Sequence, residues 1–475
     1  MSHHDEPSAA PEAPEAPAPF ERIETGNPQA DEILGGGFPI DSINVVMGQP
    51  GTGKTIFVEQ LVFHNAGEDR PILYLTTMSE PLPKVVRYLQ QFPFFDEAKI
   101  GVQIVYEDIG AELAAGGIDA LVPRLKESVR SLGPKIIVID SFKAIHDLAP
   151  SLPAMRRMLY ELSGLLSAYE ATTFLLGEYA DEHVATLPEF AVADGIIQFS
   201  RKELGARDER YLRVRKLRGS RYLEGIHGFR ITGRGLDIYP RLVSPEFPKT
   251  YLALKDRVSS GIPQLDTMLG GGMWRGSSML LAGPSGSGKT TLGLQFVLEG
   301  IRRDEPCVYA NFQENASQLA SVIRGYGVDV EEAARKGLHL IYRSPVELQI
   351  DSILVELFRL VTDNNIRRVV IDAIGDLATA SSDAQRLHEY IYALMQHLTV
   401  RGVTSIFVME TAGVLVGESP FNANRLSYLS DAFVLLELTA RKPITRSIRV
   451  VKARGSAHDQ QPHDFQITAK GVELA

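Results

Sequence analysis

The chain has 475 residues, of which 44% are hydrophobic and 23% are charged, the composition of a globular protein that can bury a sizeable core. Its formal net charge of -10 argues against nonspecific binding to nucleic acid or to a membrane surface. Its single cysteine, Cys307, excludes an intramolecular disulfide bond and is typical of a reducing compartment.

The first 19 residues differ in composition from the rest of the chain. They are rich in proline, alanine and glutamate, and they predict a disordered tail because they contain too little apolar surface to form a core. The start of the chain has neither the basic region nor the apolar stretch of a signal peptide. No apolar run reaches the roughly 18 residues that a membrane-spanning helix needs. We therefore expect a cytoplasmic protein without a membrane partner.

A tandem repeat follows this tail. Residues 25–37 and 260–272 share the pattern G-x-P-Q-x-D-x-x-L-G-G-G at an offset of 235 residues. The lysines of the motif described next are also 235 residues apart, so one domain has been duplicated. We expect a first domain at residues 20–244 and a second at 245–475. The linker between them is expected within residues 239–255, where three prolines interrupt the periodicity.

Each domain contains the motif G-x-x-x-x-G-K-T, at residues 48–55 and 283–290. Each copy follows an apolar run and opens a helical pattern, which is the strand–loop–helix context of a phosphate-binding loop (P-loop). The glycines let backbone N–H groups turn toward phosphate oxygens, and the helix directs its positive end at the same anion. The predicted ATP-binding residues are Gly48, Gly51, Thr52, Gly53, Lys54 and Thr55, and Gly283, Gly286, Ser287, Gly288, Lys289 and Thr290.

Three residue types in each domain have predicted roles in ATP chemistry. The P-loop lysine contacts the β- and γ-phosphates, and the threonine after it binds Mg²⁺. An aspartate that directly follows an apolar strand completes the Mg²⁺ shell, although such an aspartate also commonly caps the next helix. The predicted magnesium ligands are Thr55 and Asp140 in the first domain, and Thr290 and Asp372 in the second.

One glutamate in each domain is the candidate catalytic carboxylate. Glu80 and Glu314 both follow the strand after the P-loop helix, at nearly the repeat offset. A carboxylate beside the γ-phosphate can orient and activate an attacking water or hydroxyl group. The alternative is a carboxylate at a helix start, which the helix dipole favours without any catalytic role.

Apolar strand-like runs alternate with helical patterns in both domains. Their hydrophobicity is continuous, which indicates strands that are buried on both faces of a parallel sheet covered by helices. In such an α/β fold, ligands bind at the carboxyl ends of the strands. The clearest runs are residues 71–75, 136–139, 173–176, 307–310, 369–371 and 405–409.

A Lys-x-Arg-Gly-Ser motif also occurs twice. Lys216 and Arg218 in the first domain correspond to Lys452 and Arg454 in the second. On a strand, residues two apart share a face, so each pair presents two cations together. Such a pair suits phosphate, as in an arginine finger that reaches the ATP of a neighbouring subunit. A solvated basic hairpin or a nucleic-acid patch remains open for the first copy, because residues 201–221 are rich in cations.

Taken together, the chain from about residue 22 onward resembles the KaiC-like ATPases, a family of double-domain RecA-type ATPases that includes the bacterial circadian clock protein KaiC. The most specific matches are residues 257–261, 270–272 and 452–459 and the two P-loops. The resemblance implies two tandem RecA-like domains and a double-ring homohexamer that binds ATP between adjacent subunits. It further implies ATP hydrolysis, mainly in the first domain, and Ser/Thr autophosphorylation in the second.

Site residues follow from this resemblance by motif match. The family's phosphorylated Ser-Thr pair falls on residues 427–428, so Ser427 is the implied phosphoacceptor, although the sequence alone favours an ordinary polar residue there. The residues implied to contact ATP on a neighbouring subunit are Lys216, Arg218, Lys452, Arg454 and His458.

The chain departs from the family pattern at three places. The paired catalytic glutamates of KaiC read Ser-Glu at residues 79–80 and Gln-Glu at 313–314, so one carboxylate survives in each site and the case for autokinase activity weakens. Tyr428 replaces the phosphorylated threonine. The chain stops at Ala475, soon after residues 467–471, where KaiC continues with the tail that KaiA grips. We therefore expect no KaiA-type partner, whereas a KaiB-like partner stays open.

The sequence thus predicts a Mg²⁺-dependent ATPase ring with a regulatory or signalling role. One alternative is a DNA-dependent recombinase or helicase of the same fold, but the acidic chain lacks an aromatic and basic strip for stacking bases. A second alternative is an ATP-bound scaffold that does not hydrolyse ATP, which the missing glutamates would suit.

Overall fold

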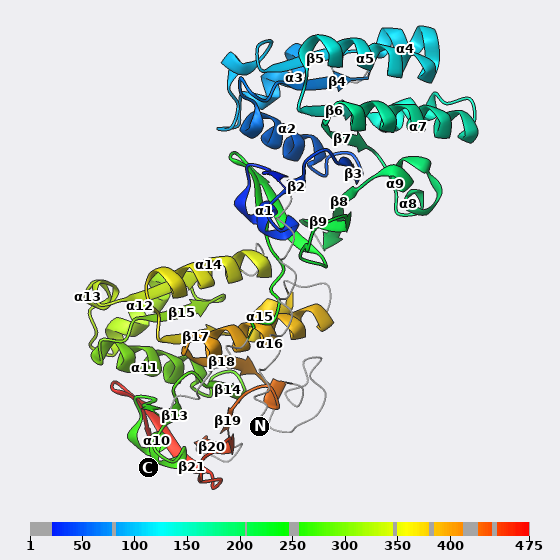
Figure 1. Ribbon diagram of the computed structural model, residues 1–475. Coiled ribbons are helices and arrows are strands. Elements are labelled where there is room, and N and C mark those ends of the chain that lie inside the picture. The colour runs from blue at the N-terminus through cyan, green and yellow to red at the C-terminus, as the bar shows by residue number, and fades with distance from the viewer. Residues whose placement is uncertain are drawn as a thin grey trace, which may run out of the picture. The chain divides into compact units, whose positions relative to one another are not determined.

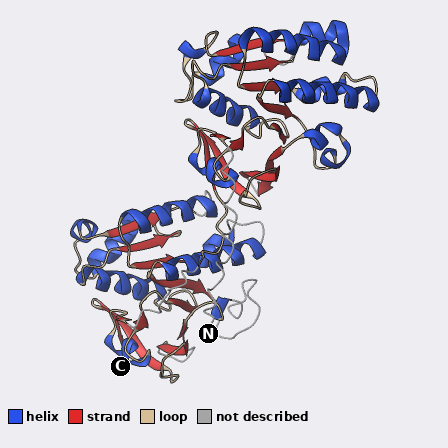
Figure 2. Ribbon diagram, in the orientation of Figure 1, coloured by secondary structure: helices blue, strands red, loops and turns tan. Residues whose placement is uncertain are grey.

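The computed structural model describes residues 21–77, 82–204, 207–246, 256–344, 349–379, 384–411, 426–438 and 444–474. The chain divides into two compact units, Met1–Arg241 and Leu242–Ala475. Each unit is built around a sheet with helices on its faces (Figures 1 and 2). The tail predicted at residues 1–19 lies outside the described residues.

The first unit contains the following elements in chain order. They are β1 (Arg22–Ile23), α1 (Pro28–Leu34), β2 (Phe38–Pro39), β3 (Ile43–Gly48), α2 (Lys54–Asn65), β4 (Ile72–Thr76), α3 (Leu82–Leu89), η1 (Glu97–Lys99), β5 (Ile104–Asp108), α4 (Gly110–Gly116), η2 (Gly117–Ala120), α5 (Leu121–Leu132), β6 (Ile136–Asp140), α6 (Phe142–Asp147), α7 (Leu152–Ala168), β7 (Thr172–Gly177), α8 (His183–Thr186), α9 (Pro188–Val192), β8 (Gly195–Leu204), β9 (Arg207–Leu217), β10 (His227–Thr232) and β11 (Gly235–Tyr239).

The second unit repeats this order with few changes. Its elements are β12 (Arg257–Val258), α10 (Pro263–Met268), β13 (Met273–Trp274), β14 (Ser278–Gly283), α11 (Lys289–Arg302), β15 (Cys307–Asn311), α12 (Ala316–Gly325), α13 (Val330–Arg335), β16 (Leu338–Tyr342), α14 (Ile350–Asp363), β17 (Arg368–Asp372), α15 (Ile374–Thr379), α16 (Ala384–Val400), β18 (Thr404–Glu410), β19 (Ala432–Leu438), β20 (Arg446–Ala453), β21 (His463–Thr468) and β22 (Gly471–Leu474).

Both large sheets have the same topology. Within the described residues, nine strands run in the order β11-β10-β9-β8-β3-β7-β6-β4-β5 in the first unit and β16-β15-β17-β18-β14-β19-β20-β21-β22 in the second. The six strands β3 to β8 are parallel, as are β14 to β19. The prediction of two α/β domains with mostly parallel sheets is therefore confirmed.

Three antiparallel strands extend each sheet on one side, β9 to β11 in the first unit and β20 to β22 in the second. Within the cation-rich stretch, residues 201–204 belong to β8 and residues 207–217 form β9, its antiparallel partner in a hairpin. Acidic neighbours pair with several of the cations. Arg201 lies 3.6 Å from Asp208, and Arg207 lies 3.4 Å from Glu209. This hairpin carries the first Lys-x-Arg motif to one edge of the sheet.

Apolar side chains fill a layer on each face of both sheets, as continuous hydrophobicity along the strands requires. In β3, Val46 packs in the layer that contains Phe57 of α2, whereas Val45 and Met47 pack in the layer that contains Leu162 of α7. Burial of each such side chain stabilises the fold by about 1.5–3 kcal/mol relative to exposure. The P-loop strand is therefore packed on both faces at the centre of the sheet.

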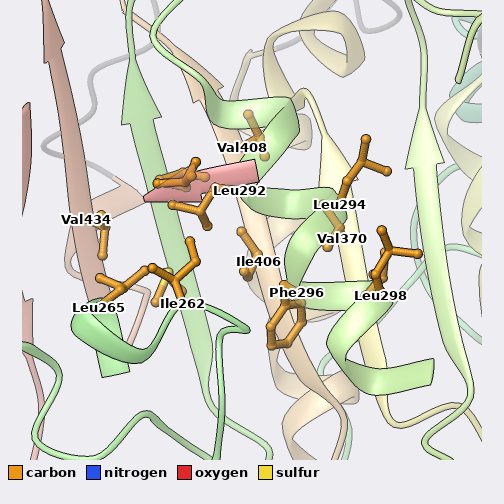
Figure 3. Packing of buried hydrophobic residues seen from close by; sticks show 14 of the residues in the cluster. Ile262, Leu265, Leu292, Leu294, Phe296, Leu298, Val370, Ile406, Val408 and Val434 are labelled. Carbon is orange, nitrogen blue, oxygen red and sulfur yellow. The ribbon is translucent and has the colours of Figure 1, made fainter. Parts of the chain in front are cut away.

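The second unit shows the same packing around its P-loop helix. Leu292 and Phe296 of α11 lie over Val370 of β17 and over Ile406 and Val408 of β18 (Figure 3). None of the helices in the described ranges combines the length and the apolar character needed to cross a membrane.

Candidate functional site: two nucleotide sites and two cation pairs

Each P-loop runs from the carboxyl end of the central strand into a helix that begins at the motif lysine, Lys54 for α2 and Lys289 for α11. The capping residues, Gly53 and Gly288, adopt left-handed φ angles of 99° and 102°. Among the described residues no side chain caps these two helices, whereas Asn315 caps α12. The first backbone N–H groups of α2 and α11 therefore remain available to an anion.

The two P-loop lysines lie folded over their own loops. The Lys54 Nζ atom donates to the carbonyl oxygens of Gly48 and Gln49, at 2.9 and 3.0 Å. The Lys289 Nζ atom donates to the carbonyl oxygen of Pro284 at 2.7 Å. Burial lowers the pKa of both ammonium groups, and nearby carboxylates counteract this effect. Phosphate oxygens would be stronger acceptors than these carbonyl groups, because they carry a full charge.

The predicted metal ligands of the second domain lie in contact. The Thr290 Oγ1 atom donates to Asp372 Oδ2 at 2.8 Å, and the Tyr309 hydroxyl donates to the same oxygen at 2.6 Å. Asp372 is only 7% exposed. Burial raises the pKa of this carboxyl group, and the two hydrogen bonds partly offset the rise. The aspartate is thus held toward the P-loop threonine by a tyrosine from β15.

The first domain has the same arrangement with longer distances. The Thr55 Oγ1 atom lies 3.4 Å from Asp140 Oδ2, and the Tyr74 hydroxyl donates to that oxygen at 3.2 Å. Burial again raises the pKa of Asp140. The sequence predicted both aspartates but missed both tyrosines. The available signal was a tyrosine inside the same apolar run of both copies, 235 residues apart.

Glu314, the candidate catalytic carboxylate of the second domain, lies half-buried just after β15. Its backbone N–H donates to the side chain of Asn311 at 2.8 Å, which fixes the turn that carries it. Its Oε2 atom is buried and has no hydrogen-bond partner among the described residues. Burial, and then the charge of Asp372, raise the pKa of Glu314. Glu80, its counterpart in the first domain, lies outside the described residues.

The structure adds one exposed acid to each site that the sequence predictions did not include. Glu410 ends β18 and pairs in register with Gly283, the first residue of the P-loop. Glu178 directly follows β7, the equivalent strand. Their charges act on Lys289 and Lys54, whose pKa values they raise against the effect of burial. The signal was an acid just after an apolar strand, the same signal that identified Asp140 and Asp372.

The first Lys-Arg pair lies at the other edge of its sheet. The Arg218 guanidinium is 3.2 Å from a carboxylate oxygen of Asp194, and the Lys216 ammonium group donates to the carbonyl oxygen of Ala193. Asp194 also accepts the backbone N–H of Ile43, the first residue of β3, at 3.1 Å. The pair is therefore anchored beside the amino end of the P-loop strand.

The second Lys-Arg pair has the same position. The Lys452 ammonium group donates to the carbonyl oxygen of Ser427 at 2.7 Å, and the Arg454 guanidinium donates to that of Tyr428 at 2.7 Å. Arg454 also lies 3.8 Å from Asp431, which directly precedes β19. The structure thus brings the candidate phosphoacceptor Ser427 together with both cations. Ser427 itself is half-buried.

The strand register separates each cation pair from the P-loop of the same domain. Asn44, near the start of β3, pairs with Gly195, which in turn pairs with Leu217 between the two cations. The P-loop begins at the opposite end of β3, at Gly48, four residues from Asn44 or about 13 Å at ~3.3 Å per residue. His458 also lies in the loop of the second pair, where its Nδ1 atom is 3.2 Å from the carbonyl oxygen of Ser456. Within one domain, the P-loop and the Lys-Arg pair therefore lie at opposite ends of the central strand and do not form a single site.

Comparison with known proteins agrees with this arrangement. The family model "ATPase: KaiC" matches the chain twice, at residues 23–243 and 258–475. The circadian clock oscillator proteins KaiC of Picosynechococcus sp. and Synechococcus elongatus are each 28% identical to this chain over 458 residues, covering 94% of this chain and 87% of the relative. Circadian clock oscillator protein KaiC 1 of Synechocystis sp. is 27% identical over 459 residues. The chain, with its duplicated P-loop domain, belongs to the KaiC family of ATPases.

Proposed function

We propose that the protein hydrolyses ATP with Mg²⁺ at both P-loops, in a homohexameric ring in which each nucleotide is held between two subunits. The observation that carries this proposal is the position of each cation pair at the sheet edge opposite its own P-loop. Two cations that lie at the opposite end of the central strand from their own nucleotide site suit phosphate on a second copy of the chain. A closed ring gives every copy the same neighbour on each side.

In the second domain, each residue of the proposed site has a separate role in ATP binding or hydrolysis. The backbone of the P-loop and Lys289 bind the β- and γ-phosphates, and the buried Ser287 hydroxyl, which lacks a partner among the described residues, is free to join them. Glu314 orients the attacking water and accepts its proton. Lys452 and Arg454 of the adjacent copy stabilise the charge that develops on the γ-phosphate.

The donor set fits Mg²⁺. Among the described residues no group of three or more His, Cys, Asp and Glu side chains could hold a metal by itself. Mg²⁺ keeps several waters and takes phosphate oxygens, so one hydroxyl and one carboxylate suffice. Thr55 with Asp140 and Thr290 with Asp372 would hold the ion directly or through water. When bound, Mg²⁺ would neutralise charge on the phosphates of ATP.

Autophosphorylation of Ser427 is the finer part of the proposal. Ser427 lies beside Lys452 and Arg454, so a neighbouring copy that uses those cations would receive Ser427 near its γ-phosphate. Gln313 occupies the position of a second carboxylate and donates to Asp376 at 3.1 Å, so Glu314 alone would activate the acceptor hydroxyl. The relatives are named as circadian clock oscillator proteins, and we propose a regulatory role of that kind here, with a KaiB-like partner to be tested.

The test follows purified protein incubated with [γ-³²P]ATP and Mg²⁺, with released phosphate and protein-bound label measured together. We expect steady phosphate release that falls by about 100-fold or more when Lys54→Ala and Lys289→Ala are combined, because the lysine contacts the transferred group directly. Unchanged release in that double variant would overturn the proposed ATPase.

The protein-bound label tests whether the protein phosphorylates itself. Label that maps to Ser427, and that disappears in Ser427→Ala, would support phosphorylation. Phosphate release without label would leave an ATPase alone. Binding of ATP without release would instead favour the non-hydrolysing scaffold, and a strong stimulation of release by single-stranded DNA would favour the recombinase or helicase.

A further inference from the structure

The glycine triplet that marks the start of each repeat ends 11 residues before the P-loop but is not part of it, and the ATPase chemistry gives it no role. In the structure it contacts the loop that follows each Lys-Arg pair. A Cβ atom on Gly270 would lie 2.5 Å from the carbonyl oxygen of Ala457, and one on Gly35 would lie 2.2 Å from that of Arg221. Both distances are too short for any side chain, so these glycines allow the loop to pack closely.

An arginine in the short strand before each triplet ties the two segments together. In the second domain, Arg257 donates through Nη1 to the carbonyl oxygen of Gly272 at 2.8 Å, and through Nη2 to the Ser456 hydroxyl at 2.7 Å. Ser456 stands two residues after Arg454. One planar guanidinium group therefore connects the glycine triplet to the loop that carries the cations, in the forked geometry that only arginine provides.

The first domain repeats this connection. Arg22 donates to the carbonyl oxygen of Gly37 at 3.0 Å and to the Ser220 hydroxyl, and its Nη2 atom lies 3.4 Å from the carbonyl oxygen of Gly219. Ser220 stands two residues after Arg218, just as Ser456 stands two residues after Arg454. The two domains of the chain thus share the same three-part contact.

A stacked ring strengthens the contact in the second domain alone. The Arg257 guanidinium lies 3.4 Å from the centre of the Trp274 ring. Trp274 is the residue that pairs with Arg257 between the antiparallel strands β12 and β13. A Cβ atom on Gly455 would lie 3.7 Å from Trp274 Nε1, so the ring also borders the loop itself. In the first domain the residue that pairs with Arg22 is Pro39, which offers no aromatic face.

We propose that Arg22 and Arg257 are positioning residues for the trans-acting cations: each fixes its loop against the glycine triplet so that Arg218 or Arg454 reaches the nucleotide of the next copy. This inference rests on the proposed function, because it assigns the two arginines a part in completing a neighbour's site. Misplacement of a catalytic cation by about 1 Å costs up to ~100-fold in rate. The arginines do not contact a P-loop, so nucleotide binding by the chain's own P-loops should persist.

The test compares the full-length protein with a variant that combines Arg22→Ala and Arg257→Ala. We expect kcat to fall about 10-fold to 100-fold while the dissociation constant for a fluorescent ATP analogue changes by less than about threefold. The control combines Arg130→Ala and Arg302→Ala, two exposed arginines on helices, and should keep the native kcat. A kcat within about twofold of native in the Arg22 and Arg257 variant would overturn the inference.

Two further variants make the test specific. The first changes the contact with little risk to the fold, and the second separates a failure of the positioning inference from a failure of the proposed function. Ser220→Ala with Ser456→Ala removes only the hydroxyl acceptors, and we expect a smaller drop in kcat of about 3-fold to 10-fold, consistent with the loss of one hydrogen bond of ordinary strength per domain. If Arg218→Ala with Arg454→Ala leaves kcat unchanged, the proposed trans contact itself fails. If that variant is inactive but the Arg22 and Arg257 variant is fully active, only the positioning inference fails.

Discussion

At the scale of single residues, a buried carboxyl group distinguishes the two domains. Glu59 of α2 is fully buried, accepts the Tyr106 hydroxyl at 2.8 Å through Oε2, and leaves Oε1 without a partner among the described residues. Burial raises its pKa from 4.5 to about 8. The repeat offset places Leu294 at the equivalent position of the second domain. The first domain therefore contains a buried titratable group that the second domain lacks at the equivalent position.

This titration predicts a pH dependence of stability for the first domain alone. Between pH 4.5 and about 8, folded Glu59 keeps its proton whereas the unfolded chain releases it. The stabilising effect of the raised pKa is thus full below pH 4.5 and is lost as the pH rises toward 8. At ~1.4 kcal/mol per pKa unit, the free energy of unfolding should fall by a few kcal/mol over this range. Glu59→Gln should flatten the slope.

The measurement is urea unfolding followed by circular dichroism at pH 5, 6.5 and 8. Trp274, the single tryptophan, belongs to the second unit, so its fluorescence follows that unit separately and serves as an internal control that the substitution should leave unchanged. The same pH slope in Glu59→Gln as in the native protein would show that another group titrates. A buried amide leaves a donor unpaired, so the variant is expected to lose some stability at every pH.

Local motifs could be predicted from the sequence because their chemistry depends on neighbours along the chain. The residues of both P-loops and the two strand-end aspartates belong to this class. Glu59, Tyr74 and Tyr309 could not be predicted, because their roles depend on partners brought from other strands and helices. Tyr309, for instance, contacts Asp372 only because β15 lies beside β17 in the sheet.

At the scale of secondary-structure elements, β17 begins with a charged residue, Arg368, and arginine side chains are mostly exposed in folded proteins. The structure buries it: Arg368 is 1% exposed and bonds to Glu305 at 2.6 Å and to the carbonyl oxygens of Ser259 and Phe296 at 2.8 and 3.0 Å. Burial raises the pKa of Glu305, but Arg368 and a second arginine outweigh burial and bring that pKa below its ordinary value.

Arg368→Met should destabilise the second unit by about 3–5 kcal/mol, since it leaves a carboxylate and two carbonyl groups without their donor. Combining it with Glu305→Gln should recover part of this loss, because the uncompensated charge disappears. Urea unfolding followed by Trp274 fluorescence measures both effects. The matched control is Arg302→Met on an exposed helix end, where a change within about 0.5 kcal/mol is expected. An equally small effect at Arg368 would contradict the prediction.

The central parallel strands could be predicted because both of their faces are buried and their hydrophobicity is continuous. The antiparallel extension could not, since β9 and β20 mix charged with apolar residues and lack continuous hydrophobicity. Only the register of the sheet shows that these hairpins lead the Lys-Arg pairs to the edge opposite the P-loop.

At the scale of the whole molecule, the proposed division of each site between two copies predicts complementation. One chain with both P-loop lysines changed to alanine and another with both Lys-Arg pairs changed to alanine should each be nearly inactive alone. Coexpressed as mixed rings, they should regain about a quarter of the native turnover, because random neighbours place an intact P-loop beside an intact cation pair at one interface in about four. A mixture no more active than its parts would show that each chain completes its own site.

The strand register also bears on how output could be controlled. A monomeric chain would contain two incomplete ATP sites. Dilution that dissociates the ring should therefore abolish activity even when nucleotide is abundant. Turnover per chain would then rise with the amount of protein made and level off once rings are complete. The specific activity would in this way depend on the protein's own concentration. The reason is that one polypeptide carries both the P-loop and the cation pair, but each site needs these residues from two separate polypeptides.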